Sequence, residues 1–82
     1  MERPTSEQLL TALKEASQAH HEYETNFLKG ERDTQWAGWY ASYVLGRIGD
    51  FIAPTLLTER LIGTSGEGDW FEHAVENVLQ AL

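Results

Sequence analysis

The chain has 82 residues, enough for one domain and too few for two, and its 41% hydrophobic and 23% charged residues are typical of a folded protein. Six basic against thirteen acidic residues give a formal charge of −7, which argues against nucleic acids and anionic membranes as partners. The absence of cysteine excludes disulfides, thiol catalysis and cysteine-ligated zinc.

The first segment predicts a long helix from about Ser6 to Lys29. Thr5 and Gln8 have the spacing of a capping box, in which each side chain satisfies a free backbone N–H of the other residue. A stripe with helical spacings of three and four follows: Leu9, Leu13, Ala16, His20, Tyr23 and Phe27. Gly30 is a typical residue just beyond a helix end.

A second helix is predicted from Thr34 to Leu45, with Asp33 or Thr34 as its N-cap. Only residues 31–33 separate Gly30 from that cap. Because so short a connection joins neighbouring helices, we expect the two helices to form an antiparallel hairpin.

Two shorter helices complete the chain. Pro54 suits the first turn of the third helix, whose apolar residues are Leu56, Leu57, Leu61 and Ile62. Gly63–Gly68 predicts a loop, and Asp69 then caps a fourth helix with the stripe Phe71, Val75, Val78 and Leu82. No segment has the two-residue period of a strand. The sequence therefore predicts an all-α fold, a compact bundle of four helices in a single domain of residues 1–82.

The predicted second helix is unusual because nothing between Thr34 and Gly46 carries a charge, whereas surface helices normally have a charged face. Its aromatic residues share one side: Trp36, Trp39, Tyr40 and Tyr43. The opposite side is mostly small: Ala37, Gly38, Ala41, Ser42 and Leu45. Two interpretations remain open. Either the aromatic side fills the core and the small side packs on a neighbouring helix, or part of the helix forms a surface for a partner.

The segment His20–Glu24 has the residue types of a binding site. His20 and Glu24 are four residues apart, so they share a helix face. The hairpin is expected to make three pairings along its seam: Phe27 with Trp36, Tyr23 with Trp39 and Tyr40, and His20 with Tyr43. The candidate ligand-binding residues are therefore His20, Tyr23, Glu24, Trp39, Tyr40 and Tyr43. His20 itself has three open interpretations, as a core residue satisfied by a hydroxyl or carboxylate, as a ligand-binding group, or as a metal ligand.

Signatures of a catalytic or metal site are weak. No serine lies in a G-x-S-x-G motif, residues 63–68 lack the lysine of a phosphate loop, and the Glu-x-x-His pair of di-iron bundles is missing. His20 and Glu24 alone supply too few ligands for zinc. We predict no catalytic residue, no metal and no cofactor.

Two segments resemble a pattern found in short, uncharacterised bacterial proteins. They are Ala19-His20…Tyr23-Glu24 and Asp33…Trp36…Trp39-Tyr40-Ala41, which match an A-H-x-x-Y-E helix followed by D-x-x-W-x-x-W-Y-A. The match covers roughly residues 16–46. The resemblance implies a bacterial, all-α, cytoplasmic protein, and it assigns these residues no role.

The functional prediction is a small helical binding or protein-interaction module, with a protein partner or a homodimer through the second helix. The alternative is a small-ligand or metal-binding domain, including an enzyme, at the seam around His20 and Glu24. The uncharged stretch Thr34–Gly46 is shorter than the ~20 residues that span a bilayer, and the N-terminus lacks the features of a signal peptide. We therefore expect a cytoplasmic protein with neither membrane nor nucleic acid as partner.

Overall fold

The computed structural model describes residues 3–64 and 68–82. It contains four α-helices: α1 (Ser6–Asn26), α2 (Trp36–Ile48), α3 (Pro54–Ile62) and α4 (Trp70–Gln80). No strand occurs within the described residues. The predicted all-α bundle of four helices is therefore confirmed.

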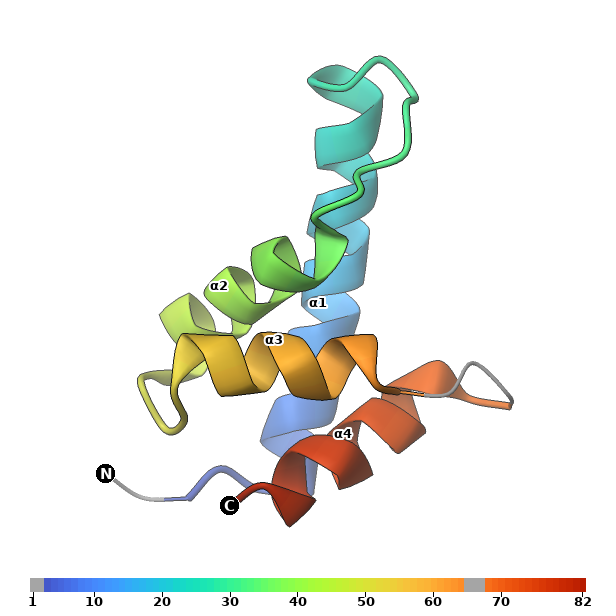
Figure 1. The fold of residues 1–82 in the computed structure, drawn as a ribbon. Coiled ribbons are helices and arrows are strands. Elements are labelled where there is room, and N and C mark those ends of the chain that lie inside the picture. Colours follow the sequence, from blue (N-terminus) through green and yellow to red (C-terminus); the bar gives the residue numbers. More distant parts are fainter. Residues whose placement is uncertain (1–2, 65–67) are drawn as a thin grey trace.

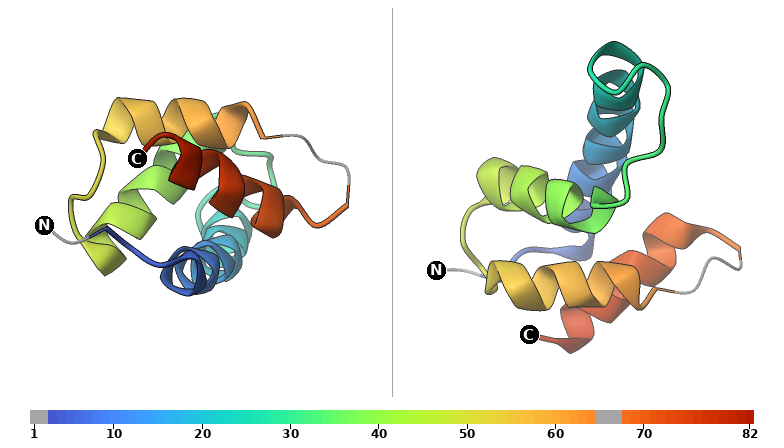
Figure 2. Two further views of the ribbon diagram at one scale, coloured as in Figure 1. Left: turned by 90° about the horizontal axis from the view of Figure 1, so that it is seen from below. Right: turned by 45° about the horizontal axis from the view of Figure 1, so that its top comes forward.

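Helices α2 and α4 pack on the N-terminal half of α1, and α3 joins these two helices. Helix α2 contacts α1 and α3, and α4 contacts α1 and α3. The C-terminal half of α1 projects beyond the other helices, and the chain then returns along it before α2 begins (Figures 1 and 2). We call residues 27–35 the return segment. Because it descends alongside α1, α2 starts next to the middle of α1 and crosses it steeply.

Helix α1 begins as the sequence predicts and ends earlier. Thr5 and Gln8 form the full capping box, with Thr5 Oγ1 accepting from the Gln8 N–H and Gln8 Oε1 accepting from the Thr5 N–H. The stripe is buried at Leu9, Leu13, Ala16 and His20. The helix ends at Asn26, three residues before the predicted Lys29. The backbone then adopts positive φ at Lys29 and Gly30, which turns the chain back. Phe27 therefore leaves the stripe and is 75% exposed.

Helix α2 is displaced toward the C-terminus from its predicted range. It begins at Trp36 because the Asp33 side chain accepts from the Gln35 N–H and holds residues 33–35 in a turn, so neither Asp33 nor Thr34 is the N-cap. It continues to Ile48 and ends at Gly49, whose φ of 118° favours glycine. The side facing the core is small or aliphatic: Ala37, Ala41, Val44 and Leu45. Small side chains on this side of α2 allow both α1 and α3 to approach α2 closely.

The aromatic side of α2 follows neither interpretation alone. Trp36 and Tyr40 pack against the hydrophobic core, whereas Trp39 and Tyr43 lie outside that cluster and are half-buried. Gly38, placed on the side that was expected to pack, is half-buried, and Ser42 is exposed. The steep crossing of α1 by α2 separates the two pairs of aromatic residues.

Helices α3 and α4 complete the core. Pro54 occupies the first turn of α3, and Asp69 caps α4 by accepting from the Phe71 N–H. The buried residues of these helices are Leu57, Leu61, Ala74, Val75 and Val78. Ile62 is 63% exposed, so its predicted role in the apolar face of α3 is wrong. The predicted loop Gly63–Gly68 lies partly outside the described residues.

No helix in the described part of the chain is long and apolar enough to cross a membrane.

Candidate functional site

The return segment is held against α1 by a polar cluster of three side chains. A His20 ring nitrogen, Nε2, lies 2.9 Å from Asp33 Oδ2. The Asp33 N–H donates to Glu24 Oε2 at 2.9 Å, and His20 Nδ1 lies 3.5 Å from Glu24 Oε1. A side chain and a backbone group of Asp33 thus bind two residues that are one turn apart on α1.

His20 is a bridge between two carboxylates. Its two ring nitrogens point in opposite directions, one toward Glu24 and one toward Asp33, and the residue is 5% exposed. The hydrogen bond with His20, and then the one accepted from the Gln35 N–H, hold the pKa of the Asp33 carboxyl below its ordinary value. Because Nε2 is hydrogen-bonded to Asp33 and Nδ1 lies within ion-pair distance of Glu24, this geometry matches the interpretation of His20 as a core residue satisfied by carboxylates.

The ring of His20 also belongs to an aromatic network that includes every tryptophan and tyrosine of the chain. Trp39 and Tyr40 each contact it in an edge-to-face arrangement, with centroid distances of 5.1 and 5.2 Å. From Tyr40 the network continues inward to Trp36 and across to Trp70 on α4. It therefore connects the surface at the α1–α2 crossing with the core.

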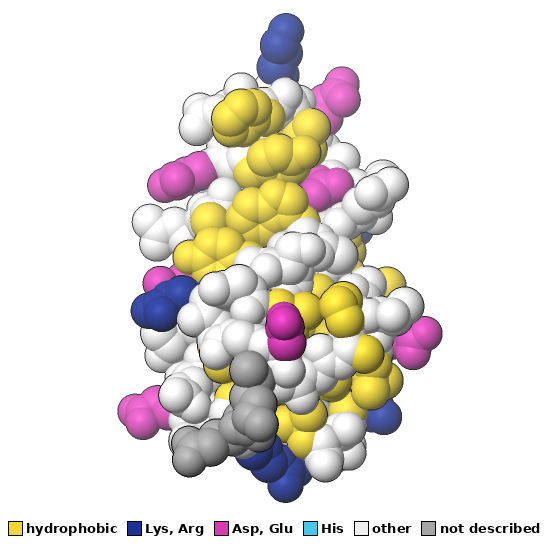
Figure 3. Space-filling model, turned by 90° about the vertical axis from the view of Figure 1, so that its left-hand side faces the viewer, with side chains coloured by type: hydrophobic (Ala, Val, Ile, Leu, Met, Phe, Trp, Pro, Cys, Tyr) yellow, Lys and Arg dark blue, Asp and Glu magenta, His cyan; other side chains and the backbone are white. Residues whose placement is uncertain are grey.

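The outward part of the network is a file of four rings, which we call the aromatic column: Phe27, Tyr23, Trp39 and Tyr43. Successive ring centroids are 5.7, 5.8 and 5.8 Å apart. Phe27 is mostly exposed, and the other three side chains are half-buried. Figure 3 shows a continuous strip of hydrophobic side chains on this face of the molecule, with acidic side chains on either side.

Two hollows share Tyr43 in their lining. The larger one has a volume of about 450 Å³ and is lined by Gly38 and Ser42 of α2. Tyr23, Trp39 and Tyr43 of the aromatic column also line it, together with Asp33 and Gln35. The smaller hollow, of about 230 Å³, lies over α1 and is lined by Glu15, Gln18, Ala19 and Glu22 as well as Tyr43.

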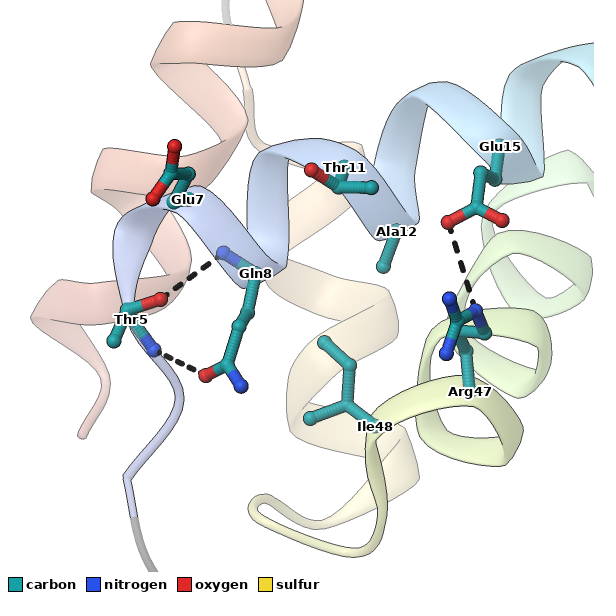
Figure 4. A pocket seen from close by; sticks show the side chains of 8 residues that line it. All are labelled: Thr5, Glu7, Gln8, Thr11, Ala12, Glu15, Arg47 and Ile48. Atoms are coloured by element: carbon teal, nitrogen blue, oxygen red, sulfur yellow. Dashed lines mark hydrogen bonds and ion pairs between the residues drawn. The ribbon is translucent and has the colours of Figure 1, made fainter.

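Another hollow, of about 380 Å³, lies between the start of α1 and the end of α2 (Figure 4). Four of its polar side chains are already used within the chain, in the capping box of Thr5 and Gln8 and in the ion pair of Glu15 with Arg47 at 3.5 Å. We assign this hollow a structural role.

The predicted seam exists, with different pairings. Five of the six predicted site residues lie within one set of ring contacts or ion pairs around His20: Tyr23, Glu24, Trp39, Tyr40 and His20 itself. Tyr23 contacts Trp39 as expected. His20 contacts Trp39 and Tyr40, and Tyr43 joins the group only through Trp39. Phe27 does not contact Trp36, because the helix ends before it.

Two participants were missed from the sequence. The bond between Asp33 and His20 was not predicted, although the resemblance had placed Asp33 in the same unit. Trp70 was not assigned to the aromatic network at all. Each joins residues from different elements, and only the spacing within an element leaves a signal in the sequence.

Among the described residues, no group of three or more His, Cys, Asp or Glu side chains is arranged to hold a metal ion. The carboxylates of Glu24 and Asp33 lie at opposite edges of the His20 ring, so these three groups do not converge on one point.

No family model matches this chain. The curated proteins and the solved structures likewise contain no match. Its function must therefore be inferred from the residues themselves.

Proposed function

We propose that this protein is a small protein-interaction module that binds a partner protein through the aromatic column. The observation that carries the proposal is the exposure of this column. Four aromatic rings contact one another in sequence, and the outermost, Phe27, is 75% exposed. Tyr and Trp dominate the binding energy of protein interfaces, and contiguous exposed apolar patches mark interaction sites.

The surroundings of the column support a rigid recognition surface. Trp39 contacts the buried ring of His20, and the return segment that carries Phe27 is held by the bonds of Asp33 to His20 and Glu24. A surface that is already ordered loses little conformational entropy when a partner binds.

A protein partner is favoured over a small ligand. The hollow beside the column is lined by neither His20 nor Glu24, the two residues on which the small-ligand alternative rests. Their polar atoms bind each other and Asp33. The outward-facing feature is an extended row of rings. Such a row suits the surface of a partner protein better than a small molecule, which binds in a concave pocket that encloses it.

Site-specific photo-crosslinking tests the proposal. We would replace Phe27 with p-benzoylphenylalanine and irradiate cells of the organism that encodes the protein. A discrete crosslinked protein is expected, and it should disappear when Tyr43→Ser is added to the same chain. The matched control places the crosslinker at Ile62, which is also largely exposed but lies on α3, away from the column.

The same experiment separates the two kinds of partner. A covalent homodimer would identify the partner as a second copy of the chain, and a heterologous adduct would identify another protein. Equal labelling from positions 27 and 62, or labelling that persists in the Tyr43→Ser chain, would refute the proposed surface. Circular dichroism confirms that each variant keeps its helices.

A further inference from the structure

We infer that the segment bound by the aromatic column is a basic amphipathic α-helix of another protein. This inference rests on the proposed function and adds the chemistry of the partner. It follows from the spacing of the rings, from the charges beside them and from the charge of the chain as a whole.

The spacing of the column matches one turn of a helix. Successive centroids from Phe27 to Tyr43 are 5.7, 5.8 and 5.8 Å apart. An α-helix rises about 5.4 Å per turn, so a helix laid along the column presents one apolar side chain to each ring. Docking of the apolar face of a helix is a recurrent mode of recognition.

The two hollows that share Tyr43 of the column are lined in part by carboxylates. Asp33 lines the larger hollow, and Glu15 and Glu22 line the smaller one. Acidic side chains on both sides of the hydrophobic strip are visible in Figure 3. A helix whose apolar stripe lies on the rings carries its neighbouring residues over these two hollows, where Arg or Lys would meet a carboxylate and an aromatic edge.

The basic groups nearby do not cancel this charge. Arg47 pairs with Glu15 at 3.5 Å, and both carboxylate oxygens of Asp33 are bonded within the chain, to His20 Nε2 and the Gln35 N–H, so Glu22 is the carboxylate that remains for a partner's cation. Lys29 and Arg32 are exposed on the return segment, outside the residues that line either hollow.

Charge also decides against a second copy as the occupant. Each chain carries a formal charge of −7, and a symmetric dimer through the column would bring the same acidic flanks together. Like charges facing each other across an interface are unfavourable, whereas opposite charges on a basic helix increase the association rate and the specificity of binding.

The test uses two synthetic peptides of about 15 residues, the length at which an isolated helix begins to be stable in water. One has a leucine stripe flanked by arginines, and its twin has citrulline, which is uncharged and nearly the same shape, in place of each arginine. Binding is followed by NMR through the Trp39 indole and the tyrosine ring signals. At low salt the arginine peptide should bind at least about tenfold more tightly than the citrulline peptide, and the difference should shrink at high salt.

Three variants locate the contacts. Tyr43→Ser should abolish binding of both peptides. Glu22→Gln should weaken binding of the arginine peptide by about threefold and leave binding of the citrulline peptide unchanged, because an exposed ion pair contributes only a little to affinity. The matched control is Glu76→Gln, an exposed acidic residue on α4 that should affect neither peptide.

Each outcome decides the question. Equal affinity of the two peptides for the column would refute a basic partner while leaving the interaction surface intact. Failure of the arginine peptide to bind, or binding mapped to α4, would refute the inference, and crosslinking from position 27 would still test the proposed function on its own.

Discussion

Replacing Gly38 with alanine should stabilise this protein without changing its fold. Gly38 lies inside α2 with ordinary helical φ, and a Cβ added there meets no atom within 4 Å. Glycine in a helix interior costs roughly 0.5–1 kcal/mol relative to alanine, because the unfolded chain loses more conformational freedom on folding. Gly46 meets the same two conditions near the end of α2. The double variant should therefore gain about 1–2 kcal/mol, a large share of the ~5–15 kcal/mol of a typical domain.

Urea unfolding followed by far-UV circular dichroism measures this gain. In thermal unfolding of a domain of this size, each kcal/mol of added stability corresponds to an increase in Tm of roughly 4–8 °C. The control is Gly49→Ala, which should lose stability because the φ of 118° at this residue is unfavourable for a Cβ. A decrease in stability for Gly38→Ala would mean that this face of α2 contacts another group. The description of the larger hollow as open at Gly38 would then be wrong.

Two further predictions concern the core and the polar cluster. Leu13→Ala should cost about 2–5 kcal/mol in urea unfolding, because Leu13 is 1% exposed in the core, while Ile62→Ala on the surface should stay within about 0.5 kcal/mol of the wild type. Asp33→Asn should lower stability at neutral pH, and its difference from the wild type should close as the pH falls through 3.8, the ordinary pKa, toward the lower pKa of the folded Asp33 carboxyl. That sign follows because a lowered pKa stabilises the fold only while the carboxyl is ionised, and a pH-independent difference would contradict the role given to the His20–Asp33 bond.

The sequence predicts the number of helices and most of the core correctly, because these depend on local patterns. The capping box at Thr5, the proline at position 54 and the aspartate at position 69 each mark a helix start within their own segment. The stripe from Leu9 to His20 is buried as the spacing predicts. Local rules therefore suffice where a single helix faces the core along its length.

The candidate site is less predictable because it depends on the angle between two helices. Periodicity placed Phe27 and Trp36 opposite each other, which requires α1 to run on to Lys29 and α2 to lie along it. The chain turns earlier, and Asp33 uses its carboxylate to bind His20 and the Gln35 N–H. The steep crossing that results decides which aromatic rings become core and which form the column, and no spacing within either helix encodes that angle.

The position of the chain ends has a practical consequence for studying this surface. The guanidinium of Arg3 donates to the Leu79 carbonyl oxygen at 3.1 Å, so the start of the described chain lies beside the last helix. The start of the described chain and the C-terminus both lie at the pole of the molecule opposite the return segment (Figure 1). An affinity tag, a fluorophore or a sensor surface attached at either end therefore leaves the column facing free solution. The domain can therefore be attached to a carrier through either end with the same side facing outward, and a true partner should be captured equally well from both attachments.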